Sequence, residues 1–196
     1  MNLTKKSTKH HLMINLKVPK KLIEYCQNQV DTYQFGKRLE FNGDKEQQLT
    51  GVIGQSVVMH YFDLGFVKGE TGFDDGVDIV YSGVKIDVKT MGRKSSVKPY
   101  FTNNFVAFQD KFHPDAYIFC SYHKTLEEIT ICGWVSKEEF HAKRKFYPKG
   151  SIRSRGDGTE FESGSDLYEI DMIDLNDVFD FHDLKTQIKQ YSITIK

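Results

Sequence analysis

The first third of the chain has apolar residues at helical spacing. Residues 19–34 are compatible with a helix that has Pro19 in its first turn and ends at Gly36. Residues 45–63 form a stronger helical candidate, because their apolar side chains cover most of the helix circumference. This second segment is therefore predicted to be a largely buried helix that stops near Gly65.

The middle of the chain changes to the two-residue period of β-strands. Four short runs are rich in aromatic and β-branched residues, which favour strands: 77–81, 84–91, 116–122 and 129–135. Ser82 and Gly83 separate the first two runs, and this pair suits a tight hairpin turn.

The last third contains a capping signal and a polar stretch. Ser136 and Glu139 have the spacing of a capping box, which opens a helix over roughly 136–145. Further on we expect a long Gly-, Ser- and charge-rich loop, one strand and a C-terminal helix: 147–166, 167–173 and 174–190. The order of elements favours an α/β or α+β domain around one mixed sheet.

Composition limits the class of protein. A length of 196 residues suits a single domain over 1–196, and a hydrophobic fraction of 39% is enough for a core. No apolar run approaches the ~20 residues that a membrane-spanning helix needs. The cysteines are odd in number and form no CxxC pair, which favours a reduced, cytoplasmic compartment.

Charge is distributed in blocks, although the formal net charge is zero. Residues 1–21, 84–98 and 143–155 are strongly basic, and 156–183 contains ten acids with no Lys or Arg. Such blocks are commonly solvated faces, and three basic blocks can also converge on a polyanion. Composition leaves both interpretations open.

One short constellation carries candidate chemistry. In a strand, Asp87 and Lys89 lie on the same face, and a hairpin brings Asp78 near the same edge. Two carboxylates beside an ammonium suit Mg²⁺, which prefers oxygen ligands, and the lysine can orient an attacking water. An isolated D-x-K triplet is usually a solvated strand face, but the clean alternation and the nearby Asp78 favour a site.

These residues resemble the signature of the PD-(D/E)XK nuclease superfamily. Asp78 matches the acid at the start of one strand, and Asp87-Val88-Lys89 match the acid-x-Lys of the next. The resemblance covers about 45–145; it leaves the N-terminal helical and basic segment 1–44 and the C-terminal loop and acidic segment 146–196 unassigned. It implies a restriction-endonuclease-like core, with a central mixed four- to five-stranded sheet flanked by helices.

The implied activity is metal-dependent hydrolysis of DNA phosphodiester bonds, as in restriction, phage or repair endonucleases. Asp78, Asp87 and the Val88 carbonyl would hold Mg²⁺, with Mn²⁺ as a substitute, and Lys89 would stabilise negative charge at the nucleophile. A homodimer is an option, because cutting both strands often needs two sites.

Two positions depart from the family pattern. Val77 replaces the proline of the signature, and Gln55 stands where the preceding helix often supplies a glutamate. Gln55 is interpreted either as a ligand to metal-bound water or an orienter of Lys89, or as an amide bonded to backbone inside the core. Because glutamine has no negative charge, the alternative function is a catalytically inactive nuclease-fold module that binds nucleic acid or protein.

Basic and aromatic residues supply further candidates for DNA contact. Five cations are predicted to contact phosphates: Arg93, Lys94, Lys98, Arg153 and Arg155. The aromatic residues between 100 and 112 can stack on bases, but core packing is the favoured use for most of them. Cys120, Cys132 and nearby histidines are zinc-ligand types, although both cysteines fall in apolar strands, where buried free thiols are common.

Overall fold

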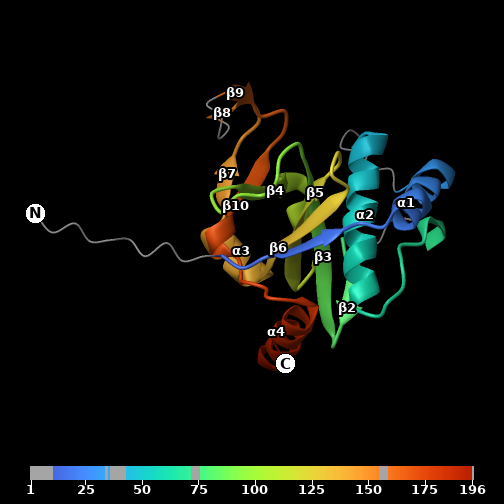
Figure 1. Cartoon of the computed structure of the whole chain (residues 1–196). Helices are drawn as coiled ribbons and strands as arrows, with labels where there is room; N and C mark the ends of the chain where they lie inside the picture. The colour runs from blue at the N-terminus through green and yellow to red at the C-terminus, as the bar shows by residue number, and fades with distance from the viewer. Residues whose placement is uncertain (1–10, 34, 36–42, 72–75, 155–158, 196) are drawn as a thin grey trace, which may run out of the picture.

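The centre of the molecule is a mixed five-stranded sheet (Figure 1). The computed structural model describes residues 11–33, 35, 43–71, 76–154 and 159–195. In spatial order the strands are β1 (Ile14–Lys17), β6 (Glu128–Ser136), β5 (Ala116–His123), β3 (Val84–Arg93) and β2 (Ile79–Tyr81). Only β3 and β5 pair in parallel; the other neighbours are antiparallel. The prediction of a mixed α and β domain is thus confirmed.

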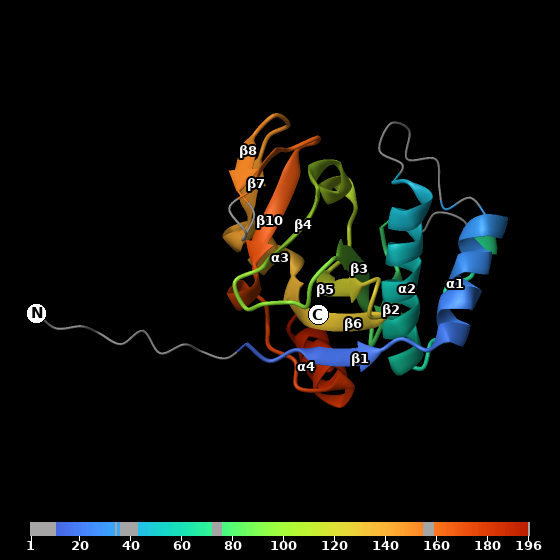
Figure 2. The same ribbon diagram turned by 45° about the horizontal axis from the view of Figure 1, so that its top comes forward.

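Two helices lie on one side of this sheet, the second against the strands and the first packed mainly on the second, as Figure 2 shows. They are α1 (Lys20–Thr32) and α2 (Lys45–Tyr61), close to their predicted ranges. Asp44 caps α2 by accepting the backbone N–H of Gln47, whose side chain returns a bond to the Asp44 N–H. The α2 residues Val52, Ile53 and Val57 then pack into the core with apolar residues of the sheet.

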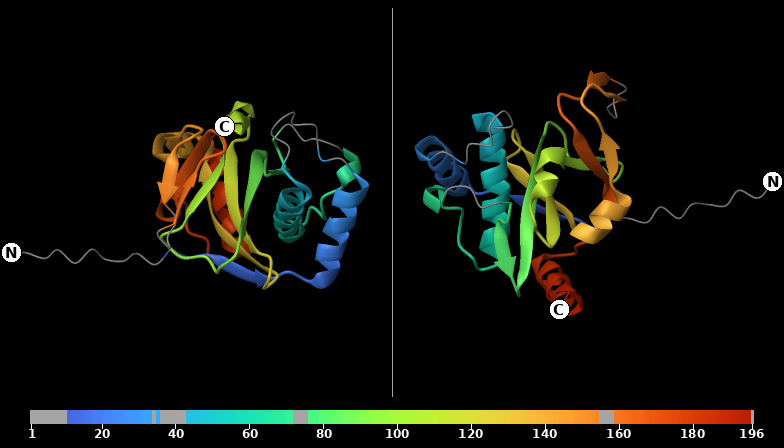
Figure 3. Two further views of the ribbon diagram at one scale, coloured as in Figure 1. Left: turned by 90° about the horizontal axis from the view of Figure 1, so that it is seen from above. Right: turned by 180° about the vertical axis from the view of Figure 1, so that it is seen from behind.

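A second layer lies on the opposite side, seen from above in Figure 3. It comprises a three-stranded sheet, β4 (Thr102–Val106), β10 (Leu167–Asp171) and β7 (Lys145–Tyr147), together with α3 (Lys137–Lys143). The predicted capping box at Ser136 and Glu139 is confirmed and starts α3. Aromatic rings fill the space between the layers, because Phe105, Tyr117 and Phe140 pack in one buried cluster.

The last helix, α4 (Phe181–Thr194), closes the end of the sheet. It begins later than the predicted residue 174, because the Asp180 side chain caps it by accepting the N–H of Asp183. Leu184 and Ile188 are fully buried, and the Trp134 indole on β6 donates to Gln187 at 2.7 Å. Three short 3₁₀ segments complete the described elements: η2 (Gly69–Thr71), η3 (Ala107–Lys111) and η4 (Met172–Asp174).

Three local predictions differ from the structure. The predicted loop 147–166 contains β8 (Ile152–Ser154) and β9 (Glu160–Glu162), which pair with each other. The loop prediction was wrong because it relied on the charge-rich composition of this segment. In the structure the Arg153 guanidinium packs over the rings of Tyr147 and Phe161, a contact that composition does not predict. The strands β1 and β4 were not predicted, since each has only four or five residues.

No helix in the described residues is long and apolar enough to span a membrane.

The contact between α2 and β3 gives a test of the packing. A Cβ built on Gly54 would lie 1.9 Å from the Thr90 Oγ1 and 2.8 Å from the Thr90 Cβ, whereas one on Gly51 meets nothing within 4 Å. We expect Gly54→Ala to lower the free energy of unfolding by about 1–3 kcal/mol through overpacking. Gly51→Ala, the matched control, should raise it by about 0.5–1 kcal/mol, because alanine favours the helix.

Urea denaturation of both variants measures these changes. Equal stabilisation by the two alanines would contradict the close approach of α2 to β3 at Gly54.

Candidate active site

Asp87 and Lys89 form a buried ion pair on β3. The Lys89 Nζ lies 2.6 Å from the Asp87 Oδ2, and the two side chains are only 12% and 5% exposed. Because side chains alternate along a strand, Ile86 and Val88 point to the other face and join the apolar cluster under α2. The structure therefore brings the acid and the lysine together as the alternation predicted.

Asp78 lies immediately before β2, beside the same part of β3. Its N–H donates to the Ile86 carbonyl at 3.0 Å, and its Oδ2 accepts the Val88 N–H at 2.6 Å. The β-ladder between β2 and β3 ends at Ile79. Beyond it the Asp78 carboxylate, and not a backbone carbonyl of β2, accepts the N–H of Val88 on β3. The N–H and carbonyl of one strand residue point to the same edge, which puts the Val88 carbonyl on the edge that Asp78 occupies.

Gln55 reaches this region from α2. Its Nε2 donates to the Asp78 backbone carbonyl at 3.4 Å, and the side chain is half-buried. Gln55 was interpreted either as a group acting on metal-bound water or Lys89, or as an amide bonded to backbone. Its described hydrogen bond is of the second kind. Gln55 thus ties α2 to the residue that precedes β2.

The layer that contains β4 covers the ion pair. The Lys89 ammonium lies 5.1 Å from the centre of the Phe105 ring, which is the range of a cation–π contact. The Tyr117 hydroxyl is buried and has no hydrogen-bond partner among the described residues. Burial and the charges of Asp87 and Asp110 raise the pKa of Tyr117 well above its ordinary value, so this phenol stays neutral beside the acids.

Sequence reasoning did not connect Phe105 or Tyr117 to the site. Phe105 was expected to pack in the core, which it does at 6% exposure, but its strand had not been predicted. Tyr117 is the parallel neighbour of Asp87, in register on β5. The strand pattern around Tyr117 was visible in the sequence, but its pairing with β3 was not.

The oxygen donors at the strand edge suit a hard cation. Asp78 and Asp87 supply carboxylates, and the Val88 carbonyl supplies a third oxygen, a set that Mg²⁺ completes with water. Within the described ranges, no cluster of three or more His, Cys, Asp or Glu side chains is arranged to hold a metal.

The zinc-ligand types do not assemble. The Cys120 and Cys132 thiols are buried, and burial raises the pKa of Cys132 to about 11 and that of Cys120 well above its ordinary value. His141 contacts Asp110 instead, at 2.8 Å. The cysteines are therefore protonated core residues, as their apolar strands predicted.

The five predicted phosphate contacts divide into different environments. Lys94 and Lys98 are exposed on the segment that follows β3. Arg93 turns inward, donates to the Thr102 carbonyl at 2.5 Å and has a pKa that burial lowers. Arg153 forms an ion pair with Glu169 in which the side chains are 12% and 5% exposed. Arg155 lies outside the described residues.

Comparison of this chain with protein-family models, with curated proteins and with solved structures finds no match.

The Asp87–Lys89 pair gives a stability prediction. Lys89→Met leaves the Asp87 carboxylate without its ammonium partner and should lower the free energy of unfolding by about 3–5 kcal/mol. The double variant Asp87→Leu with Lys89→Met should be closer to the parent protein, because it removes the charge that is costly to bury. Lys85→Met, at an exposed position of the same strand, is the control. A Lys89→Met protein as stable as the control in guanidinium titrations would refute the burial of this pair.

A second prediction concerns Asp110, which accepts hydrogen bonds from Arg144 at 2.7 Å and His141 at 2.8 Å. Burial raises the pKa of Asp110, but the two hydrogen bonds outweigh it and hold the pKa below the ordinary 3.8. The stabilisation is therefore present above pH 3.8 and is lost as pH falls through the lower pKa of the folded state. Asp110→Asn should cost about 1–3 kcal/mol at pH 7.

Unfolding measured from pH 7 to pH 2 tests this dependence. The difference between Asp110→Asn and the parent should shrink below pH 3.8. The exposed Asp31, which pairs with Lys45, offers the control Asp31→Asn with a much smaller effect. A constant difference across the whole pH range would show that the Asp110 charge is not the stabilising group.

Proposed function

We propose that this chain is a metal-dependent DNA endonuclease with a restriction-endonuclease-like core. The observation that supports it is the Asp87–Lys89 ion pair on β3, 2.6 Å apart, with the Asp78 carboxylate bonded to the N–H of Val88, the residue between them. Two carboxylates and a lysine in a site of low exposure are groups that metal-dependent phosphodiester hydrolysis can use.

In this proposal Asp78, Asp87 and the Val88 carbonyl hold one Mg²⁺, or Mn²⁺ in its place. The ion would supply polarisation of the phosphate and a bound water of lowered pKa. Lys89 orients the nucleophilic water and stabilises the negative charge that develops on the phosphate. Gln55, being neutral, supports the position of Asp78 rather than a second metal.

The DNA would approach the strand edge rather than the covered face. Asp78 is half-buried, whereas the Asp87 and Lys89 side chains are mostly buried and Phe105 packs over the ammonium. Lys94 and Lys98 follow the same strand and are exposed, so they are the cations best placed for phosphate contacts. Arg93 and Arg153 instead hold protein groups and contribute to the position of β3 and of the second layer.

A second candidate function is a catalytically inactive nuclease-fold module that binds nucleic acid or protein. Two observations favour it: Gln55 brings no negative charge, and the Asp87 and Lys89 charges are already paired with each other. The exposed Lys94 and Lys98 serve either function. Assembly into a homodimer stays a prediction in both.

Plasmid cleavage with Mg²⁺ or Mn²⁺ tests the catalytic proposal. We expect nicked or linear products from the parent protein, none with EDTA, and at least about 100-fold slower cleavage by Asp87→Asn and by Lys89→Met. Lys85→Ala, on the same strand but exposed, is the matched control and should cleave normally. Circular dichroism on each variant, and Mn²⁺ titration followed by electron paramagnetic resonance, separate loss of fold from loss of metal.

Two results would overturn the proposal. Absence of cleavage by the parent with either metal removes the enzymatic function, and unchanged cleavage by both variants removes the site. In the first case, DNA affinity as a function of salt tests the inactive module. Replacing Lys94 and Lys98 by glutamine should then reduce the slope of log K against log salt by about 2.

A further inference from the structure

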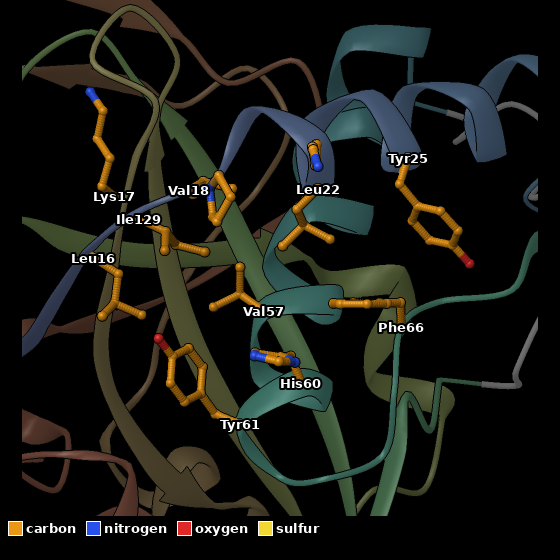
Figure 4. Close-up of a pocket in the computed structure, with 12 residues that line it drawn as sticks. Leu16, Lys17, Val18, Leu22, Tyr25, Val57, His60, Tyr61, Phe66 and Ile129 are labelled. Atoms are coloured by element: carbon orange, nitrogen blue, oxygen red, sulfur yellow. The ribbon is translucent and has the colours of Figure 1, made fainter.

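A separate cavity lies under the turn between β1 and α1, on the side of the sheet that α2 covers. Its volume is roughly 460 Å³, within the range of about 300–1,000 Å³ that small-molecule sites occupy. Figure 4 shows Leu16, Leu22, Val57 and Ile129 around it, contributed by β1, α1, α2 and β6. None of these residues belongs to the candidate active site, so the cavity is argued independently of the proposed function.

Ring contacts hold the aromatic side of the cavity in place. The His60 and Phe66 rings stack at 5.4 Å with 12° between their planes, and Tyr61 stacks on Phe181 at 3.9 Å with 3°. Tyr25, which also lines the cavity, donates its hydroxyl to the Val67 carbonyl at 2.8 Å. These walls are therefore formed before any ligand arrives, which lowers the entropic cost of binding.

The charge at the rim has one sign. Lys17 and Lys21 line the cavity, and none of the lining residues in the described part of the chain is acidic. Figure 4 shows Lys17 directed away from the cavity, and its ammonium binds the Leu126 carbonyl, so Lys21 is the cation left for a ligand. The first turn of α1 contains Lys20 and Lys21 and no acid, a distribution that does not stabilise a helix start. Helix stability thus does not explain these lysines.

We propose that this cavity binds an amphipathic monocarboxylate of the medium-chain fatty acid class. The hydrocarbon chain lies between the aliphatic residues and the His60–Phe66 stack, where apolar burial supplies most of the affinity. The carboxylate lies at the rim beside Lys21. The single sign of the rim charge selects an anion over a neutral lipid of the same length.

Calorimetric titration of the full chain with decanoate and with decanol tests both parts of this proposal. We expect one decanoate site and clearly weaker binding of decanol. Lys21→Gln should weaken decanoate about two- to fivefold, the range of a partly exposed ion pair, with no effect on decanol. Lys149→Gln, exposed beyond β7, is the matched charge control and should leave decanoate affinity unchanged.

Variants that fill the cavity locate the site. Leu22→Trp from α1 and Leu16→Phe from β1 should each weaken decanoate more than tenfold, with thermal melts that confirm folding. No decanoate binding by the parent, or full binding by both filled variants, would overturn the proposal. Equal affinity for decanoate and decanol, unchanged in Lys21→Gln, would overturn the anion specificity. A nuclease result of either kind leaves this test unaffected, because the two sets of residues do not overlap.

Discussion

The two faces of β3 have opposite chemistry, and the rest of the structure is arranged around that constraint. Ile86 and Val88 must be covered by apolar surface, and α2 covers them, so close to the strand that Gly54 meets Thr90 without space for a Cβ. Asp87 and Lys89 necessarily point the other way. Because β5 pairs with β3 on one edge and the second layer lies over this face, the two side chains are mostly buried, while the β2 ladder ends at Ile79 on the other edge, beside Asp78.

Charged groups inside a protein carry a desolvation cost that a pair of opposite charges only partly offsets. In the second layer several partly buried charges are paired in this way. Asp110 forms ion pairs with Arg144 and His141, Arg153 forms one with Glu169, and aromatic rings pack against both arginines. The core on the α2 side consists instead of aliphatic and aromatic residues.

Predictions succeeded where the signal lay within one element or one turn. The helix over 45–63, the hairpin at Ser82 and Gly83 and the capping box at Ser136 are all confirmed, because each depends on residues close together in the chain. Both turn residues of the hairpin have positive φ, 52° and 85°, as that turn requires. The loop over 147–166 was wrong, because β8 and β9 are short strands whose pairing depends on partners that composition does not reveal.

The sequence by itself predicted that Asp87 and Lys89 share a face and that Asp78 lies beside the same part of the strand, because strand alternation and a two-residue turn favour this arrangement. Only the tertiary structure decided that Phe105 covers Lys89, that Tyr117 lies beside Asp87 and that Arg153 is paired with Glu169. Each of these contacts joins separate strands across a long stretch of chain, so side-chain periodicity within one strand does not encode it.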